Sequence, residues 1–228
     1  MNGTQSDLAE LSQMADTAEK TGVATLICLP ATLLAIAPKG IIIGAQACHP
    51  KPSGAHTGDI SAEMLVDVGA THILAGHSER RSDHGESDSD VAAQAEAIWR
   101  AGATAVICLG ETLAERDAGH TLSVIARQLA GSIPNDATPA NTIIAYEPVW
   151  AIGTGKVATP DQVAEVHDFI RNSLPNTLAD ASLLYGGSVK ASNAAELFAL
   201  ENVNGGLVGG ASLKASDFCP IIEALAAS

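Results

Sequence analysis

The sequence predicts an α/β fold in which parallel strands alternate with helices. Short apolar runs recur along the whole chain, and segments with helical periodicity separate most of them. The runs are apolar at consecutive positions, which is typical of parallel strands buried on both faces. Polar, glycine-rich segments follow nearly every run, as expected when the loops after many strands share one site.

Seven apolar runs are the candidate strands. A faint repeat supports equivalent units, because Gly69-Ala70-Thr71 and Gly102-Ala103-Thr104 each precede a run, and a polar segment follows each. In chain order, the predicted strands cover residues 23–29, 41–44, 71–75, 105–109, 143–146, 182–185 and 206–208.

Helices are predicted between most of these strands. The clearest start is Thr159-Pro160-Asp161-Gln162, where Thr is the N-cap, Pro takes the first helical position and Gln closes a capping box. Pro175 ends this helix. Further helical patterns cover residues 7–20, a segment marked by Leu122, Ile125 and Leu129, and a terminal segment marked by Phe218, Ile221, Ile222 and Leu225.

The chain shows no break in composition and no flexible linker, so residues 1–228 are expected to form a single domain. Repeated βα units allow either a doubly wound sheet or a (β/α)₈ barrel. A doubly wound sheet would concentrate its chemistry at one switch point, and the chain has no G-x-G-x-x-G fingerprint. Polar exits after nearly every strand favour the barrel.

Charge and cysteine content narrow the classes of function. The formal net charge of −14 argues against a nucleic-acid partner and against an anionic membrane surface. A small anionic substrate remains compatible, because helix N-termini and backbone N–H groups can hold a phosphate. The four cysteines are scattered, which favours neither a zinc site nor disulfides. The chain lacks a signal-peptide or membrane-spanning pattern, so a cytoplasmic location is expected.

One stretch joins a strand to a carboxylate. The apolar run 143–146 ends at Glu147, and Pro148 then keeps the preceding residue extended. An apolar loop tip and two glycines, Gly153 and Gly155, follow. A carboxylate at the base of such a loop suits a base that gains proton affinity when water is excluded. An ordinary strand exit explains this stretch equally well.

Two other kinds of strand exit carry candidate groups. His77 follows a strand directly, and a helix N-terminus there would keep its imidazole neutral. A surface turn with Glu79 paired to Arg80 is the better reading of this segment in isolation. The glycine-rich exits at 185–189 and 205–213 suit a phosphate held by backbone N–H groups, rather than two tight turns. The other histidines are expected to be surface or structural residues, and no metal is expected.

Six ordered segments resemble the triosephosphate isomerase family along essentially the whole chain. They are Gly54-Ala55-His56-Thr57-Gly58-Asp59-Ile60-Ser61, Gly76-His77-Ser78-Glu79-Arg80-Arg81, Cys108-Leu109-Gly110-Glu111-Thr112, the stretch 146–155, Tyr185-Gly186-Gly187-Ser188-Val189 and Leu207-Val208-Gly209-Gly210-Ala211-Ser212-Leu213. The resemblance implies a TIM (β/α)₈ barrel and an enzyme of glycolysis and gluconeogenesis. That enzyme interconverts dihydroxyacetone phosphate and glyceraldehyde 3-phosphate through an enediolate, with no cofactor.

The resemblance also implies roles for individual residues. Glu147 matches the base that moves the proton, and His77 the neutral electrophile. The remaining matches are the phosphate donors Gly153, Ser188, Gly209 and Gly210, the lid at 148–158 with its latch Tyr185 and Ser188, the apolar clamp Ile152 and Leu207, and the neighbouring Ser78 and Glu79. Thr57 lies in the loop that in this family enters a neighbouring subunit, which implies a homodimer.

The family pattern begins with a strand carrying Asn-x-Lys, and this chain starts after it, at Met1-Asn2-Gly3. A barrel lacking its first strand is therefore expected, with open edges near residues 23–29 and 206–208. The site would also lose a fixed ammonium, expected to pair with Glu79. Lys156 and Lys51 are the nearest substitutes by sequence, although neither is obviously placed for the role. Ala47 stands where the family usually has a polar residue.

Two explanations of the short start are an internal methionine taken for the true start, which we favour, and a genuinely shortened barrel. Either way, the polypeptide as written is expected to be a less active isomerase than a longer form. A phosphate-binding barrel without turnover is the alternative function. A third hypothesis is a structural or interaction role for an edge-exposing barrel, with no affinity for phosphate.

Overall fold

The computed structural model describes residues 1–152 and 156–228. Its strands form one seven-stranded parallel sheet in which each strand pairs with the next along the chain. The strands are β1 (Leu26–Leu29), β2 (Ile42–Ala45), β3 (His72–Ala75), β4 (Thr104–Leu109), β5 (Thr142–Tyr146), β6 (Ser182–Tyr185) and β7 (Gly205–Gly206). This is the predicted α/β barrel architecture without a strand between β1 and β7.

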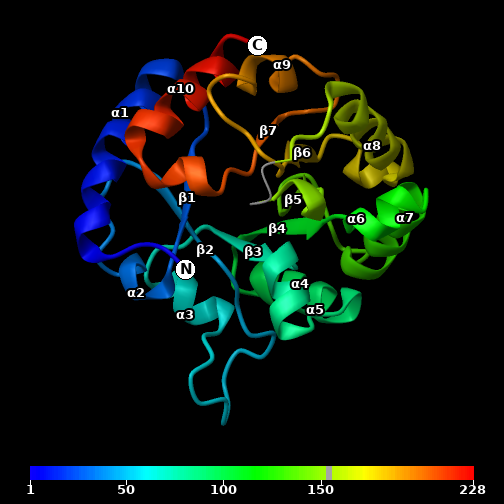
Figure 1. The fold of residues 1–228 in the computed structure, drawn as a ribbon. Helices are drawn as coiled ribbons and strands as arrows, with labels where there is room; N and C mark the ends of the chain where they lie inside the picture. Colours follow the sequence, from blue (N-terminus) through cyan, green and yellow to red (C-terminus); the bar gives the residue numbers. More distant parts are fainter. Residues whose placement is uncertain (153–155) are drawn as a thin grey trace.

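The helices lie around the outside of the curled sheet, as Figure 1 shows. Short helices follow several strands directly, and longer ones run back along the sheet. In the described residues the α-helices are α1 (Glu10–Thr21), α2 (Ala31–Leu34), α3 (Ala62–Asp67), α4 (Ser78–His84), α5 (Asp88–Arg100), α6 (Leu113–Asp117), α7 (Thr121–Ser132), α8 (Pro160–Ser173), α9 (Ala194–Phe198) and α10 (Ala215–Ala226). Four 3₁₀ turns, η1 (Gln5–Ala9), η2 (Val149–Ala151), η3 (Asn176–Leu178) and η4 (Gly210–Leu213), complete this set.

Successive side chains of each strand point to opposite faces of the sheet, so the strands contribute to two apolar clusters. Ile73, Ile107 and Ile144 belong to the larger cluster, which includes the buried faces of the helices. Leu74, Val106, Cys108 and Ala145 form a smaller cluster from the alternate positions. Burial on both faces explains the continuous apolar runs of the sequence.

The strand register brings the ends of three strands to one level. Leu109 of β4 is opposite Tyr146 of β5, and Tyr146 is opposite Tyr185 of β6. The residues that follow these positions therefore emerge together at the carboxyl edge of the sheet. This edge is where a parallel α/β barrel places its functional side chains.

The capping box predicted for α8 is confirmed. The Thr159 hydroxyl accepts from Gln162 N–H at 3.3 Å, and Gln162 Oε1 accepts from Thr159 N–H at 3.0 Å. The predicted end strands are shorter than their apolar runs, since β1 begins at Leu26 and β7 spans only Gly205–Gly206. Each of these strands has a single neighbour, so one side of its backbone lacks the ladder that would extend it.

A cavity of about 1830 Å³ lies where the sheet does not close. Residues of β1 and of the segment 204–210 line it, together with side chains from the inner face of the sheet. The open edges predicted from the sequence are therefore present, and the cavity between them reaches the carboxyl edge of the strands.

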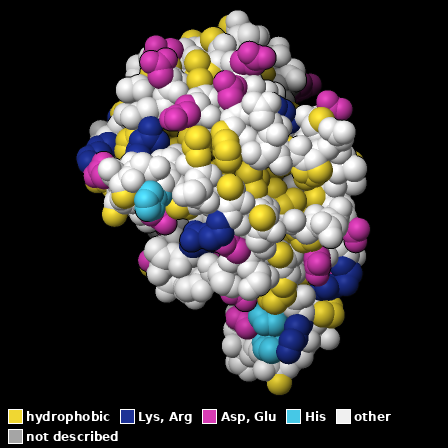
Figure 2. All heavy atoms as spheres, turned by 90° about the vertical axis from the view of Figure 1, so that its right-hand side faces the viewer, with side chains coloured by type: hydrophobic (Ala, Val, Ile, Leu, Met, Phe, Trp, Pro, Cys, Tyr) yellow, Lys and Arg dark blue, Asp and Glu magenta, His cyan; other side chains and the backbone are white. Residues whose placement is uncertain are grey.

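Two surface features bear on partners. The loop between β2 and α3 projects from the body of the molecule and carries histidine side chains (Figures 1 and 2). Acidic side chains are scattered over the face shown in Figure 2. Among the described residues, no helix combines the length and the apolarity needed to cross a membrane.

Candidate active site

Glu147 and His77 meet at the carboxyl edge of the sheet, although 70 positions separate them in the sequence. Glu147 follows β5 and is 2% exposed, and His77 follows β3. Glu147 Oε1 lies 2.9 Å from His77 Nε2, and Glu147 Oε2 accepts from the Ser78 N–H at 3.1 Å. The carboxylate therefore has a defined partner on each oxygen.

The backbone around Glu147 requires small neighbours. The Glu147 N–H donates to the Leu109 carbonyl at 2.7 Å, which continues the β4–β5 ladder by one residue. A methyl group added at Gly186 would lie 2.7 Å from Glu147 Cγ, and one added at Gly110 would overlap the Glu147 carbonyl. Glycine at the exits of β4 and β6 therefore makes room for the carboxylate between them.

His77 is held by the start of the helix that it caps. It is the N-cap of α4, and its Nδ1 accepts from the Glu79 N–H at 3.3 Å. Because Nδ1 is the acceptor, the ring proton is on Nε2, which donates to Glu147. This arrangement gives a neutral imidazole with an N–H directed into the site.

The pKa of His77 reflects opposing influences. Burial lowers it, while the hydrogen bond that His77 donates to Glu147 and the charges of Glu147 and Glu79 raise it, and the net direction is upward. The carboxylate therefore accounts for the proton affinity of the ring, against the effect of desolvation. A ligand that drew Glu147 away would leave His77 with a stronger preference for the neutral form.

The base of the loop after Glu147 is fixed by a buried carboxylate that the sequence reasoning missed. Glu111 is 0% exposed and accepts from Trp150 Nε1 at 2.9 Å, from the Tyr146 hydroxyl at 3.2 Å and from Arg116 Nη1 at 3.2 Å. Arg116 also lies over the Trp150 ring, 5.2 Å from its centroid. The one sequence feature that could have pointed to Glu111 is its position in the polar segment 110–112, directly after β4.

The residues predicted to hold phosphate gather around the same cavity, as far as the structure describes them. Ser188, Gly209 and Gly210 line it together with Glu147 and His77. A methyl group added at Gly209 or Gly210 would meet nothing within 4 Å, so packing alone does not require glycine there. Open space beside backbone N–H groups is compatible with an anion. Gly153 lies outside the described residues.

The predicted apolar and latch residues also lie near the site. Ile152 and Leu207 line the cavity, and both are partly buried. Tyr185 is fully buried at the end of β6. Its ring lies so close to Gly187 that any side chain at 187 would displace it.

Glu86 and Glu79 both line the cavity, but the Glu86 side chain is 9% exposed whereas the Glu79 side chain is 73% exposed. Glu86 Oε1 accepts from Arg80 Nε at 2.8 Å and from Gln94 Nε2 at 3.0 Å. Its Oε2 is buried and has no hydrogen-bond partner in the described part of the chain. Lys51 lies in the projecting loop, and Lys156 is exposed in the segment before α8.

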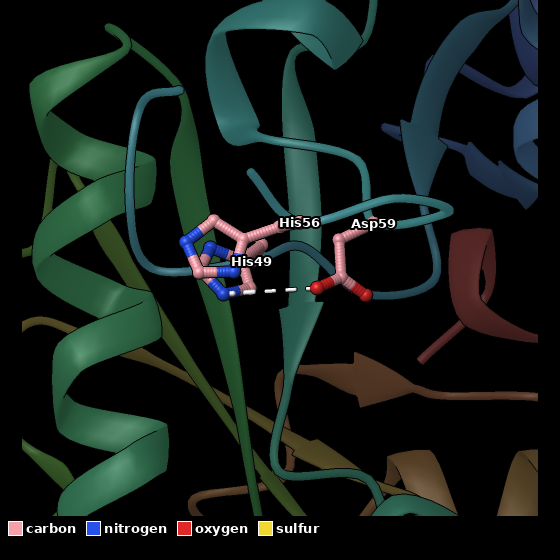
Figure 3. A group of neighbouring side chains, drawn as sticks. All are labelled: His49, His56 and Asp59. Atoms are coloured by element: carbon pink, nitrogen blue, oxygen red, sulfur yellow. Dashed lines mark ion pairs between the residues drawn. The ribbon is translucent and has the colours of Figure 1, made fainter. Parts of the chain in front are cut away.

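A second group of polar side chains lies in the projecting loop, away from this site. His49, His56 and Asp59 converge there, with His49 Nε2 3.8 Å from Asp59 Oδ2 (Figure 3). The Lys51 N–H donates to His49 Nδ1 at 3.0 Å, so the ring proton is on Nε2, the atom that faces Asp59. A metal-binding histidine needs the opposite arrangement, in which the second nitrogen donates. The donor set therefore does not fit a metal ion.

The fold and the site together define an α/β-barrel enzyme in which a carboxylate and an imidazole meet at the ends of β5 and β3, the two strands that flank β4. A family model described as triosephosphate isomerase matches residues 1–225. A triosephosphate isomerase of Ruegeria sp. (strain TM1040) is 60% identical over 235 residues, covering 100% of this chain and 96% of that protein. One from Jannaschia sp. (strain CCS1) is 56% identical over 237 residues, with the same coverage.

A solved structure agrees with these relatives. The crystal structure of triosephosphate isomerase from Bartonella henselae matches with a TM-score of 0.91 at 49% sequence identity, covering 98% of this chain and 94% of that one. The chain therefore belongs to the triosephosphate isomerase family.

Proposed function

We propose that the chain interconverts dihydroxyacetone phosphate and D-glyceraldehyde 3-phosphate, with Glu147 as the base. The carrying observation is the 2.9 Å contact between Glu147 Oε1 and His77 Nε2 at one end of the cavity. Glu147 removes a proton from one carbon of the triose and returns it to the neighbouring carbon through an enediolate, while one hydroxyl proton passes between the oxygens on those two carbons. His77 donates its Nε2 proton in a hydrogen bond to the substrate oxygens, which stabilises their developing charge.

The phosphate of this substrate is held by backbone N–H groups of Gly153, Ser188, Gly209 and Gly210. The lid at 148–158 then covers the substrate, with Tyr185 and Ser188 as its latch and Ile152 and Leu207 as its apolar clamp. Excluding water strengthens each electrostatic contact in the site. The chemistry needs no cofactor and no metal.

A proton-exchange assay tests this function. Incubating the chain with dihydroxyacetone phosphate in D₂O should place deuterium on the substrate carbon, and Glu147→Gln should abolish that exchange. His77→Asn should slow exchange while leaving phosphate affinity within a small factor. Exchange that survives Glu147→Gln unchanged would contradict the assignment of the base.

We also propose that the cavity between β1 and β7 lowers the activity of this polypeptide. The unpartnered Glu86 Oε2 and the open strand edges support this, because an added strand could supply both a ladder and a cation there. Adding before Met1 a strand that carries the Asn-x-Lys pattern should raise kcat/KM by a factor on the order of 10² to 10³. Equal kcat/KM for the two forms would refute the proposal.

The alternative function is phosphate binding without turnover. The cavity between β1 and β7 favours it, because the proposed phosphate site lines the same cavity that we expect to lower the activity. A protein of that kind binds a dianion such as phosphoglycolate but exchanges no substrate proton. Calorimetry with phosphoglycolate beside the exchange assay separates the two, because binding without exchange selects the alternative.

We further propose a homodimer, formed through the loop that carries Thr57, and a cytoplasmic location. Thr57 is exposed on the projecting loop, and Met64 and Val68 of the adjoining segment are 56% and 36% exposed. Met64 lies on α3, and Val68 is the C-cap residue of that helix, four positions further on. Light scattering should give twice the mass of the chain, and Thr57→Arg should shift it toward the monomer.

A further inference from the structure

His167 is a buried imidazole for which the proposed reaction has no use. It lies on α8, is 0% exposed, and has its Nδ1 2.9 Å from the Asn202 carbonyl oxygen. A carbonyl oxygen only accepts, so Nδ1 carries the ring proton and Nε2 has a free lone pair. Asn202 is the one non-glycine residue of the described chain with positive φ, at 65°. The carbonyl oxygen that accepts from His167 thus belongs to a residue with left-handed backbone conformation.

The ring of His167 lies against the two tyrosines that end β5 and β6. Its centroid is 5.9 Å from that of Tyr146, edge-on, and 6.4 Å from that of Tyr185. The two tyrosine rings are themselves 6.4 Å apart. Three aromatic rings from α8, β5 and β6 therefore form one packed group behind the strand ends.

Two polar atoms of this group are complementary. Among the described residues, His167 Nε2 and the Tyr185 hydroxyl are both buried without a hydrogen-bond partner. The nitrogen can only accept, and the hydroxyl can donate. Leaving both atoms unpaired in the interior costs free energy, which a hydrogen bond between them would recover.

The two tyrosines of this group are bonded in sequence to Glu147 and to the glycine that packs against it. Tyr146 immediately precedes Glu147. Tyr185 immediately precedes Gly186, whose Cα leaves just enough room for Glu147 Cγ. A displacement of either tyrosine would therefore move the carboxylate or the wall against which it rests.

We propose that His167 is a positioning residue of the site: its Nε2 accepts a hydrogen bond from Tyr185 and so fixes the strand ends on both sides of Glu147. This inference rests on the proposed isomerase function. Burial lowers the pKa of His167 to about 4, which keeps the ring neutral and Nε2 available as an acceptor at neutral pH.

The first test is the tautomer, read by long-range ¹H–¹⁵N NMR on the full chain at pH 7. We expect a protonated Nδ1 and an unprotonated Nε2 that shifts when Tyr185 is replaced by Phe. A proton on Nε2, or an Nε2 signal that ignores Tyr185→Phe, would overturn the proposal.

The second test is a double-mutant cycle on stability. Tyr185→Phe should lower the folding equilibrium constant about fivefold in the unsubstituted chain, the worth of one hydrogen bond. It should cause no loss in a His167→Phe background, where the acceptor is already gone. Equal losses in both backgrounds would show that the two side chains do not interact.

The third test is kinetic. His167→Phe keeps the ring packing and should lower kcat on the order of tenfold while KM changes less than twofold, because misplacing the base affects the chemical step. Ile170→Val, at another buried position of α8, is the matched control and should leave kcat unchanged. Unchanged kcat in His167→Phe would overturn the positioning role.

These readouts separate this inference from the proposed function. If the function were wrong, the unsubstituted chain would show no turnover, while the tautomer and the coupling to Tyr185 would still be seen. If the inference alone were wrong, turnover would be present and the tautomer or the coupling would fail.

Discussion

At the scale of single residues, the site depends on which group holds each proton. Because the Glu79 N–H donates to His77 Nδ1, the ring proton is on Nε2, and Glu147 Oε1 accepts the hydrogen bond from it. The Ser78 N–H occupies the other carboxylate oxygen. The resting site is thus already arranged with a charged acceptor and a neutral donor in contact, and a substrate must come between them.

Replacing Glu147 tests this balance directly. In Glu147→Gln the Glu147 charge that raises the pKa of His77 is gone, and among the described residues only the charge of the exposed Glu79 then opposes the effect of burial. We expect the pKa of His77 to fall below its ordinary value, so that the ring stays neutral to lower pH. An NMR titration of the His77 ring measures this. An unchanged or higher pKa in the variant would contradict the assigned cause.

The pKa of His167 predicts a pH dependence of stability. The pKa is about 4 in the folded chain and near its ordinary value of 6.5 in the unfolded one. The unfolded state therefore binds the proton first as the pH falls. The part of the unfolding free energy that depends on neutral His167 is fully present above pH 6.5. Between pH 6.5 and 4 the unfolding free energy falls by on the order of 3 kcal/mol.

Urea unfolding at several pH values checks this loss. Between pH 6.5 and 4, the unfolding free energy of His167→Phe should fall less steeply with decreasing pH than that of the unsubstituted chain. This holds whatever the substitution does to stability at pH 7. An identical slope in both proteins would place the acid sensitivity elsewhere.

At the scale of elements, strand ends and caps were readable from the sequence, because local chemistry sets them. Pro148 marks the end of β5, and Thr159 with Gln162 marks the start of α8, as predicted. The role of Glu111 could not be predicted from the sequence, because it depends on Arg116, Trp150 and Tyr146 converging on it in the folded chain. The convergence of His167 with Tyr185 was hidden for the same reason. The predicted roles of Gly209 and Gly210 came from the family resemblance alone.

The contacts of Glu111 predict how the loop after Glu147 is anchored. Glu111→Gln keeps the size of the side chain but removes the charge that Arg116 and Trp150 meet. We expect a loss of about 2 to 4 kcal/mol in unfolding free energy, because the Arg116 side chain, 15% exposed, then keeps only Glu165, at 4.0 Å, as a charged partner among the described residues. Chemical denaturation measures the loss. Glu115→Gln, which keeps a side-chain oxygen that the Thr112 N–H can bond in the capping box of α6, should cost less than half as much.

At the scale of the whole molecule, the sheet follows the order of the chain, so the two ends of the sequence lie at the two open edges. The middle strands β3, β4 and β5 each have neighbours on both sides, and β4 pairs with β5 over five residues. We propose that residues 1–228 nevertheless behave as one domain, since a continuous apolar cluster links the first helix to the last.

Because the sheet is open between β1 and β7, we expect unfolding to begin at these two edge strands before the middle of the sheet opens. Amides of Leu26–Leu29 and Gly205–Gly206 will exchange with deuterium through partial openings, while those of β4 and β5 wait for complete unfolding. Native-state hydrogen exchange at rising urea will therefore show two terminal sectors releasing early around a protected centre.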